Sequence, residues 1–250
     1  MGAIAFEMRW RFCFWLPNGF FHDGFVTSPH LNRFYELRMT AVQTFTFNPF
    51  QENTYVLYDE TGEAVIIDPG CVEKDEYQEL YDFIEAKGLK PVEIINTHAH
   101  IDHVLGVAAL KRKYNIPFAL HQIDEPYLKA VKTYSSNYGF YQFDEPEIDR
   151  YLKEGEIVKF GNSELEIIFV PGHAPGHVAF VSHADHFVIG GDVLFYMSIG
   201  RSDLPGGNHE TLLKSIRTQM FTLPDDYKVY AGHMQATTIG FEKKNNPFFR

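Results

Sequence analysis

The 250-residue chain is poor in several features that would each define a class of protein. It contains only two cysteines, Cys13 and Cys71. Two cysteines cannot form a framework of disulfide bonds, so the sequence favours a reducing, cytoplasmic location. Uninterrupted apolar runs of 18 residues or more are absent as well. We therefore expect no membrane-spanning helix.

Basic residues are scarce relative to acidic ones. The chain has 22 Lys and Arg against 33 Asp and Glu, which gives a formal net charge of −11. Binding to the phosphates of nucleic acid requires a basic face, so nucleic acid is not the expected partner. A metal ion or a few placed lysines could still hold a small anion locally. The expected partner is a small-molecule substrate, and the sequence does not indicate the oligomeric state.

A serine-nucleophile motif is also absent. The pattern G-x-S-x-G does not occur, and Cys71 has no evident base beside it. These absences favour direct attack by water over a covalent intermediate on the enzyme.

The character of the sequence changes near Met39. Residues 1–38 hold both tryptophans but show neither a signal-peptide pattern nor a helical or strand period. We interpret them as an N-terminal extension that is unstructured or an artefact of start-site assignment. The alternative is an arm docked on an apolar surface or a dimer interface. Residues 39–250 are predicted to form one domain.

From Met39 onward, apolar spacing predicts strands alternating with helices. Strands are expected over 42–47, 54–58, 64–67, 92–96, 116–120, 165–170, 177–181, 187–189 and 228–230, and helices over 75–87, 104–114 and 210–220. Residues 124–141 are expected to be helical at first and then irregular, as a loop over the site. Strand-rich blocks flanked by helices in two halves predict a layered α/β protein with sheets inside and helices outside.

The segment THAHIDH at residues 97–103 carries the strongest chemical signal. Histidine nitrogen and aspartate oxygen are ligands that Zn²⁺ and its first-row neighbours prefer. One segment cannot complete the coordination of two metals, so distant donors are required. His173, Asp192 and His233 are the candidates, because each follows a short apolar strand in a glycine-bearing turn.

The series THAHIDH, PGHAPGH (171–177), GGD (190–192) and AGH (231–233) resembles the metallo-β-lactamase superfamily, in particular its short, single-domain, glyoxalase II-like hydrolases. The resemblance covers residues 39–250. It implies a four-layered αββα sandwich and a dinuclear site with two Zn²⁺ ions, with Fe or Mn as alternatives.

The resemblance also implies a role for each donor. The first metal would be bound by His98, His100 and His173, the second by Asp102, His103 and His233, with Asp192 bridging both. Asp102 would in addition orient the attacking hydroxide. Asp68 fits a carboxylate that orients a ligand histidine, whereas His177 is expected to be structural. One departure is Met234, which adds bulk beside the site where relatives usually have glycine.

Tyr196 and Arg201 are the candidates for substrate contact. For Arg201 the alternative is an ion pair with Asp203 that fixes its loop. The pair Lys243 and Lys244 is predicted to lie on a solvated helix face.

The expected function is hydrolysis of a thioester such as an S-acylglutathione, by attack of a metal-bridging hydroxide. One alternative is a persulfide dioxygenase with a single iron, and others are a lactonase or a β-lactamase. A non-enzymatic binding module would predict a degenerate site, yet all seven donors are present. Metal analysis distinguishes the thioester hydrolase from the persulfide dioxygenase, because the dioxygenase would hold one iron and consume oxygen.

Overall fold

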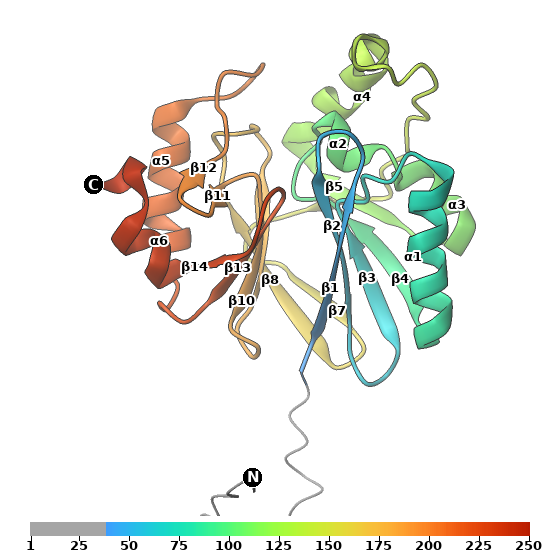
Figure 1. The fold of residues 1–250 in the computed structure, drawn as a ribbon, viewed down its shortest axis with the longest axis horizontal. Coiled ribbons are helices and arrows are strands. Elements are labelled where there is room, and N and C mark those ends of the chain that lie inside the picture. Colours follow the sequence, from blue (N-terminus) through green and yellow to red (C-terminus); the bar gives the residue numbers. More distant parts are fainter. Residues whose placement is uncertain (1–38) are drawn as a thin grey trace, which may run out of the picture. The chain divides into compact units, whose positions relative to one another are not determined.

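The computed structural model of the chain describes residues 39–250, so the predictions for residues 1–38 lie outside the described part. Two six-stranded sheets face each other, and helices cover their outer faces (Figure 1). The strand orders are β1-β2-β3-β4-β5-β6 and β14-β13-β10-β9-β8-β7. This arrangement is the predicted four-layered αββα sandwich.

The first sheet is antiparallel from β1 to β3 and parallel from β3 to β6. Its strands are β1 (Ala41–Phe47), β2 (Glu52–Tyr58), β3 (Glu63–Ile67), β4 (Lys90–Ile95), β5 (Phe118–His121) and β6 (Arg150–Leu152). The helices that follow its strands are α1 (Lys74–Lys87), α2 (Ile101–Val104), α3 (Val107–Tyr114) and α4 (Glu125–Tyr134). A capping box of Glu73 and Glu76 begins α1, and Gly88 ends it with a φ of 64°.

The second sheet also contains six strands. They are β7 (Ile157–Phe160), β8 (Ser163–Phe169), β9 (Val178–Ser182), β10 (Phe187–Gly191), β13 (Lys228–Ala231) and β14 (Thr237–Thr238). The strands β11 (Leu194–Phe195) and β12 (Ser198–Ile199) form a small hairpin, and the covering helices are α5 (His209–Thr218) and α6 (Ile239–Asn245). The 3₁₀ turns within residues 39–250 are η1 (Gln122–Asp124), η2 (Ser135–Tyr138), η3 (Met220–Thr222) and η4 (Pro247–Phe249).

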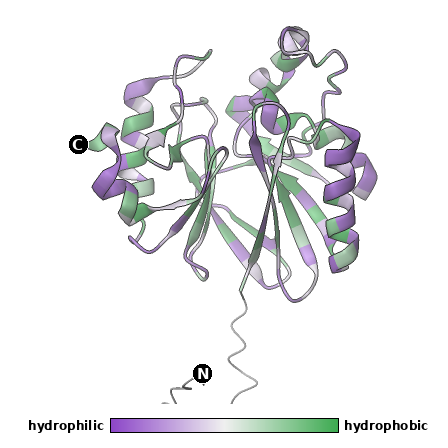
Figure 2. Ribbon diagram, in the orientation of Figure 1, coloured by the Kyte–Doolittle hydropathy of each residue, from purple (hydrophilic) through white to green (hydrophobic). Residues whose placement is uncertain are grey.

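Three apolar clusters separate the four layers. Successive residues of a strand point to opposite faces, so each inner strand contributes to two clusters. In β2, Val56 packs toward the helices, while Tyr55 and Leu57 pack toward the other sheet. Figure 2 shows the same division, with hydrophobic residues concentrated on the strands and hydrophilic residues on the outer helices. None of the helices in residues 39–250 is long and apolar enough to cross a membrane.

The helix predicted over residues 104–114 is confirmed from Val107 to Tyr114, but it does not begin at Val104. The chain instead forms two helices, α2 and α3, with Leu105 and Gly106 between them. The amide of Gly106 donates to the carbonyl of Pro69 at 2.8 Å and is therefore lost to a continuous helix. The break gives Asp102 and His103 a short helix of their own at the end of the sheet.

Several short elements have no counterpart among the elements predicted from the apolar pattern. The strands β6 and β7 have three and four residues, which is too short for an alternating pattern to be distinctive. The two-residue strand β14 is defined by its pairing with β13. Such strands depend on a neighbour more than on their own sequence.

Replacement of Leu165 tests the packing between the sheets. Its side chain is wholly buried in the cluster between them. We expect Leu165→Ala to lower the free energy of unfolding by about 2–5 kcal/mol, because it leaves a cavity. The neighbouring residue Glu164 is exposed, so Glu164→Ala should cost less than about 1 kcal/mol. Urea denaturation of both variants measures the difference, and equal losses would contradict this assignment of faces.

Candidate metal centre

All seven predicted donors lie at one end of the two sheets, in segments that follow strands. His98 and His100 lie between β4 and α2, Asp102 and His103 on α2, His173 between β8 and β9, Asp192 after β10, and His233 after β13. The side chains of His98 and His103 have no solvent exposure. Strand ends therefore bring together residues that are up to 135 positions apart, from His98 to His233.

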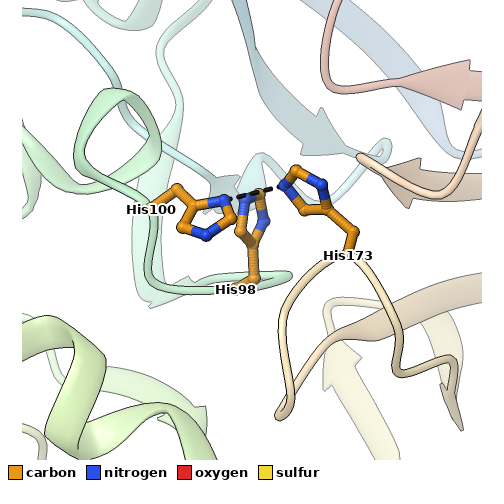
Figure 3. Close-up of side chains that lie close together, drawn as sticks. All are labelled: His98, His100 and His173. Carbon is orange, nitrogen blue, oxygen red and sulfur yellow. Dashed lines mark hydrogen bonds between the residues drawn. The ribbon is translucent and has the colours of Figure 1, made fainter. Parts of the chain in front are cut away.

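Within residues 39–250, three groups of side chains have ligand atoms that all lie within 4.8 Å of one another. One consists of Asp68, His98 and His103, and the other two consist of predicted donors alone. The histidine group consists of His98, His100 and His173, and the mixed group consists of Asp102, His103 and His233. These are the two sets that the sequence resemblance implies. In the histidine group, Nδ1 of His100 lies 2.7 Å from Nε2 of His173, and the three rings converge from two loops (Figure 3).

Asp192 lies between the two groups. Its Oδ2 is 3.4 Å from Nε2 of His173 and 3.4 Å from Nε2 of His233. Its Oδ1 is 3.5 Å from Nε2 of His103. The carboxylate thus faces one member of the histidine group and two members of the mixed group, which is the position that a bridging ligand requires.

In four of the histidines, Nδ1 makes a hydrogen bond to an oxygen atom of the protein. These contacts are His98 Nδ1 to Thr97 Oγ1 (3.0 Å), His103 Nδ1 to Asp68 Oδ2 (3.1 Å), His173 Nδ1 to the Arg201 carbonyl (2.6 Å) and His233 Nδ1 to the Phe50 carbonyl (3.1 Å). Donation from Nδ1 places the lone pair on Nε2, which faces the centre. A ligand histidine is commonly oriented in this way by a bond from its other nitrogen.

Three of the donors hold buried polar atoms that have no hydrogen-bond partner. They are Nε2 of His98, Nε2 of His103 and Oδ1 of Asp192. Each such atom costs about 1–3 kcal/mol when it is left unsatisfied. Nitrogen and carboxylate oxygen are ligands that Zn²⁺ and related divalent ions take, so the residues fit a metal at each group.

The two groups differ in their electrostatics. In the histidine group, burial lowers the pKa of His98 well below its ordinary value, and burial together with His173 lowers that of His100 to about 3. In the mixed group, burial also opposes protonation, but the carboxylates Asp102 and Asp192 outweigh it. They raise the pKa of His103 well above its ordinary value and that of His233 to about 10. Without metal, the histidine group is neutral and the mixed group holds protons.

The carboxylate of Asp68 is linked to both donor groups by hydrogen bonds. Its Oδ1 accepts from the Thr97 amide at 2.7 Å, and its Oδ2 accepts from the Thr97 hydroxyl at 2.6 Å and from Nδ1 of His103. Because the Thr97 hydroxyl also meets His98, one buried carboxylate reaches a ligand candidate in each group. This is the location predicted for a carboxylate that orients a ligand histidine.

His177, expected to be structural, is wholly buried and belongs to neither donor group. Its ring stacks on His98 with centroids 4.7 Å apart and an interplanar angle of 18°. Its Nε2 accepts from the amide of Asp192 at 3.0 Å. The side chain thus contacts two donors and is not itself part of a ligand group.

The candidates for substrate contact have partners within the chain. Arg201 makes two bonds to Asp203, of 2.7 and 2.8 Å, as the alternative predicted. Tyr196 stacks on Phe241 with centroids 5.2 Å apart. In α6, Lys243 donates to Asp225 at 2.7 Å. Contact of Tyr196 or Arg201 with substrate stays a prediction.

Met234, the departure noted in the sequence, directly follows His233 and is 58% exposed. Its φ is 67°, in the left-handed region that glycine adopts without a penalty and other residues do not. The backbone there is held because the Met234 carbonyl accepts from the Asn53 side chain at 2.8 Å. A flexible apolar side chain therefore lies beside the mixed group.

The turn between β1 and β2 supports the mixed group and was missed in the sequence. Nδ2 of Asn48 donates to the carbonyls of Gly70 and Asp102, each at 3.0 Å, and Phe50 supplies the acceptor for His233. Asn and Pro between two predicted strands indicate a turn. They do not reveal that the turn spans both sheets, so no local signal identifies its role.

The comparisons with known proteins agree with this geometry. A family model described as the metallo-beta-lactamase superfamily matches residues 47–233, so the chain belongs to that superfamily. It is 36% identical over 209 residues to hydroxyacylglutathione hydrolase GloC of Haemophilus influenzae, covering 83% of this chain and 97% of the relative.

Two solved structures extend the likeness. One is TTHA1623 in a di-iron-bound form, with a TM-score of 0.74 and 37% identity, covering 83% of this chain and 100% of that chain. The other is BLEG-1 B3 metallo-beta-lactamase, with a TM-score of 0.77 and 35% identity, covering 84% and 99%. The chain thus spans nearly the whole of these three relatives.

The contrast between the groups predicts how metal loading depends on pH. A metal must displace the proton from His233, whose pKa of about 10 keeps it protonated at neutral pH. We expect affinity at the mixed group to rise with pH from 6 to 8, with proton release, while the histidine group releases few protons. Titration of the metal-free protein with Zn²⁺ in the presence of a pH indicator measures the protons released when each group binds its ion. Equal proton release at the two groups would contradict the difference in their protonation. His233→Gln should reduce proton release only when the mixed group binds its ion.

Proposed function

We propose that this metallo-β-lactamase superfamily protein is a dinuclear hydrolase that cleaves a thioester such as an S-acylglutathione. The observation that carries the proposal is the pair of donor groups with Asp192 between them. Similarity to a relative named hydroxyacylglutathione hydrolase supports the substrate class. The scarcity of cysteine supports a reducing, cytoplasmic location, where thiols persist.

Each metal position has a proposed set of ligands. His98, His100 and His173 would hold one ion, Asp102, His103 and His233 the other, and Asp192 would bind both. Two divalent ions there would supply the Lewis acidity that activates water and polarises an acyl carbonyl. The nitrogen-rich donor set suits Zn²⁺, and iron is an alternative because the similar TTHA1623 is described in a di-iron-bound form.

Asp102 is the proposed catalytic residue. Its carboxylate lies 3.2 Å from Nε2 of His233. Burial raises the pKa of Asp102, but the neighbouring His103 and His233 outweigh it and lower that pKa below its ordinary value. The group therefore stays ionised and can accept a hydrogen bond from an attacking water, which orients the oxygen toward the acyl carbon. A thiolate leaves without prior protonation, so a thioester makes no demand for a general acid.

Replacement of Asp192 tests the site. We expect Asp192→Ala to lose bound metal and to lower turnover of S-lactoylglutathione at least about a hundredfold, because both groups lose a shared ligand. Asp226 is an exposed aspartate that pairs with His186, so Asp226→Ala is the control and should behave as wild type. Metal quantification and the thioester assay are run on the same samples. Unchanged metal content and turnover in Asp192→Ala would refute the site assignment.

A persulfide dioxygenase with one iron is the main alternative, and a lactonase is another. The dioxygenase would use His98 or His100 with His173 and Asp192, which are present here too. We expect two metal equivalents per chain and hydrolysis of S-lactoylglutathione in preference to lactones. A single iron with oxygen uptake on a persulfide would overturn the hydrolase proposal.

A further inference from the structure

The carboxylate of Asp124 joins the two loops that carry the histidine group. Asp124 ends η1, directly before α4, and is wholly buried. Its Oδ2 accepts from the amide of Ala99 at 3.0 Å, and its Oδ1 accepts from the amide of Gly176 at 2.6 Å. Ala99 stands between His98 and His100, and Gly176 lies in the turn that carries His173.

Helix capping does not account for this side chain. Aspartate before a helix usually accepts from the first free amides of that helix. Asp124 is the N-cap residue of α4, yet its side chain makes no such bond. Both of its oxygens are instead directed to loops that lie 25 and 52 residues away.

The position of the carboxylate is unfavourable without these amides. Burial raises the pKa of Asp124 to about 6, and the bonds from Gly176 and Ala99 act in the opposite direction. A buried polar group is tolerated where hydrogen bonds satisfy it. The two loop amides therefore explain why an aspartate occupies this site.

The histidine group needs a connection between the sheets, because its members come from both. His98 and His100 follow β4 of the first sheet, whereas His173 follows β8 of the second. One backbone bond, from Val178 to the Thr97 carbonyl at 2.9 Å, joins the two segments nearer the strands. Asp124 joins them at the loops that carry the ligands. The approach is so close that a Cβ at Gly176 would lie 2.6 Å from Oδ1 of Asp124.

We propose that Asp124 is a positioning residue for metal binding by the histidine group. It holds the loop of His98 and His100 at a fixed distance from the turn of His173, across the two sheets. The inference rests on the proposed function in that it takes this group as a metal site. Loss of the Asp124 carboxylate should weaken metal binding at the histidine group. Binding at the mixed group should be unaffected, since that group is held by the β1–β2 turn instead.

The experiment measures Zn²⁺ affinity at both positions in full-length Asp124→Ala and Asp124→Asn, by competition with a chelator. Electronic spectra of the Co²⁺-loaded proteins identify the position affected. We expect a loss of about 10–100-fold at the histidine group, the range typical of residues that hold a ligand in place. At the mixed group the affinity should change less than about threefold. If Asp124→Ala fails to fold, the nearly isosteric Asp124→Asn carries the test, since its NH₂ cannot accept from a loop amide.

Asp59 provides a matched control. It is a buried aspartate that also joins one turn of each sheet, accepting from the amides of Thr61 at 2.9 Å and Asn162 at 2.6 Å. Asp59 directly follows the last residue of β2, whereas Glu52, the first residue of that strand, is at the end nearer the donors. Asp59→Asn should lower thermal stability and leave both affinities unchanged.

The outcomes separate this inference from the proposed function. Unchanged affinity in both Asp124 variants, or equal losses at both positions as in a general loss of stability, would overturn the positioning role. Wild-type protein that holds no metal at either group would overturn the proposed function itself.

Discussion

The apolar layer between the two sheets sets how far apart the donors of each sheet lie. Every donor group draws on both sheets: His98 and His100 meet His173, and Asp102 and His103 meet His233. The strands end at the same edge, so the fully buried residues between the sheets fix the spacing of the loops beyond them. The polar centre depends on this packing because imidazole and carboxylate side chains are too short to compensate for displaced sheets.

The sheets set the approximate positions of the donors, and polar side chains then fix the orientation of the donor rings and loops. Asp68 reaches His103 directly and His98 through Thr97. Asn48 and its turn hold the mixed group, and Asp124 lies between the two loops of the histidine group. Each connection joins segments distant in sequence through one side chain. A binding centre of this kind requires such support, because the orientation of a ligand ring depends on the bond made by its other nitrogen.

The division of charge follows from the same geometry. His98 and His100 are neutral, while Asp102 and Asp192 keep His103 and His233 protonated. His173 also faces Asp192, but burial outweighs that carboxylate and lowers the pKa of the ring. Buried imidazolium and carboxylate stabilise each other in the absence of metal. The seven donors thus form two chemically different positions at one edge of the two sheets, and that difference would let one position bind an ion more readily than the other.

The sequence by itself determined the chemistry and the class of fold. The THAHIDH segment and three further donors after strands predicted a shared metal site, since ligand types and strand ends are local features, and the resemblance to the metallo-β-lactamase superfamily implied its division into two groups. Apart from Asp68, the side chains that support those donors were decided only by the tertiary structure. Asn48, Asp124 and the break at Gly106 act through backbone groups far along the chain. Such contacts leave no periodic pattern, because they depend on how two sheets pack and not on the residues beside them.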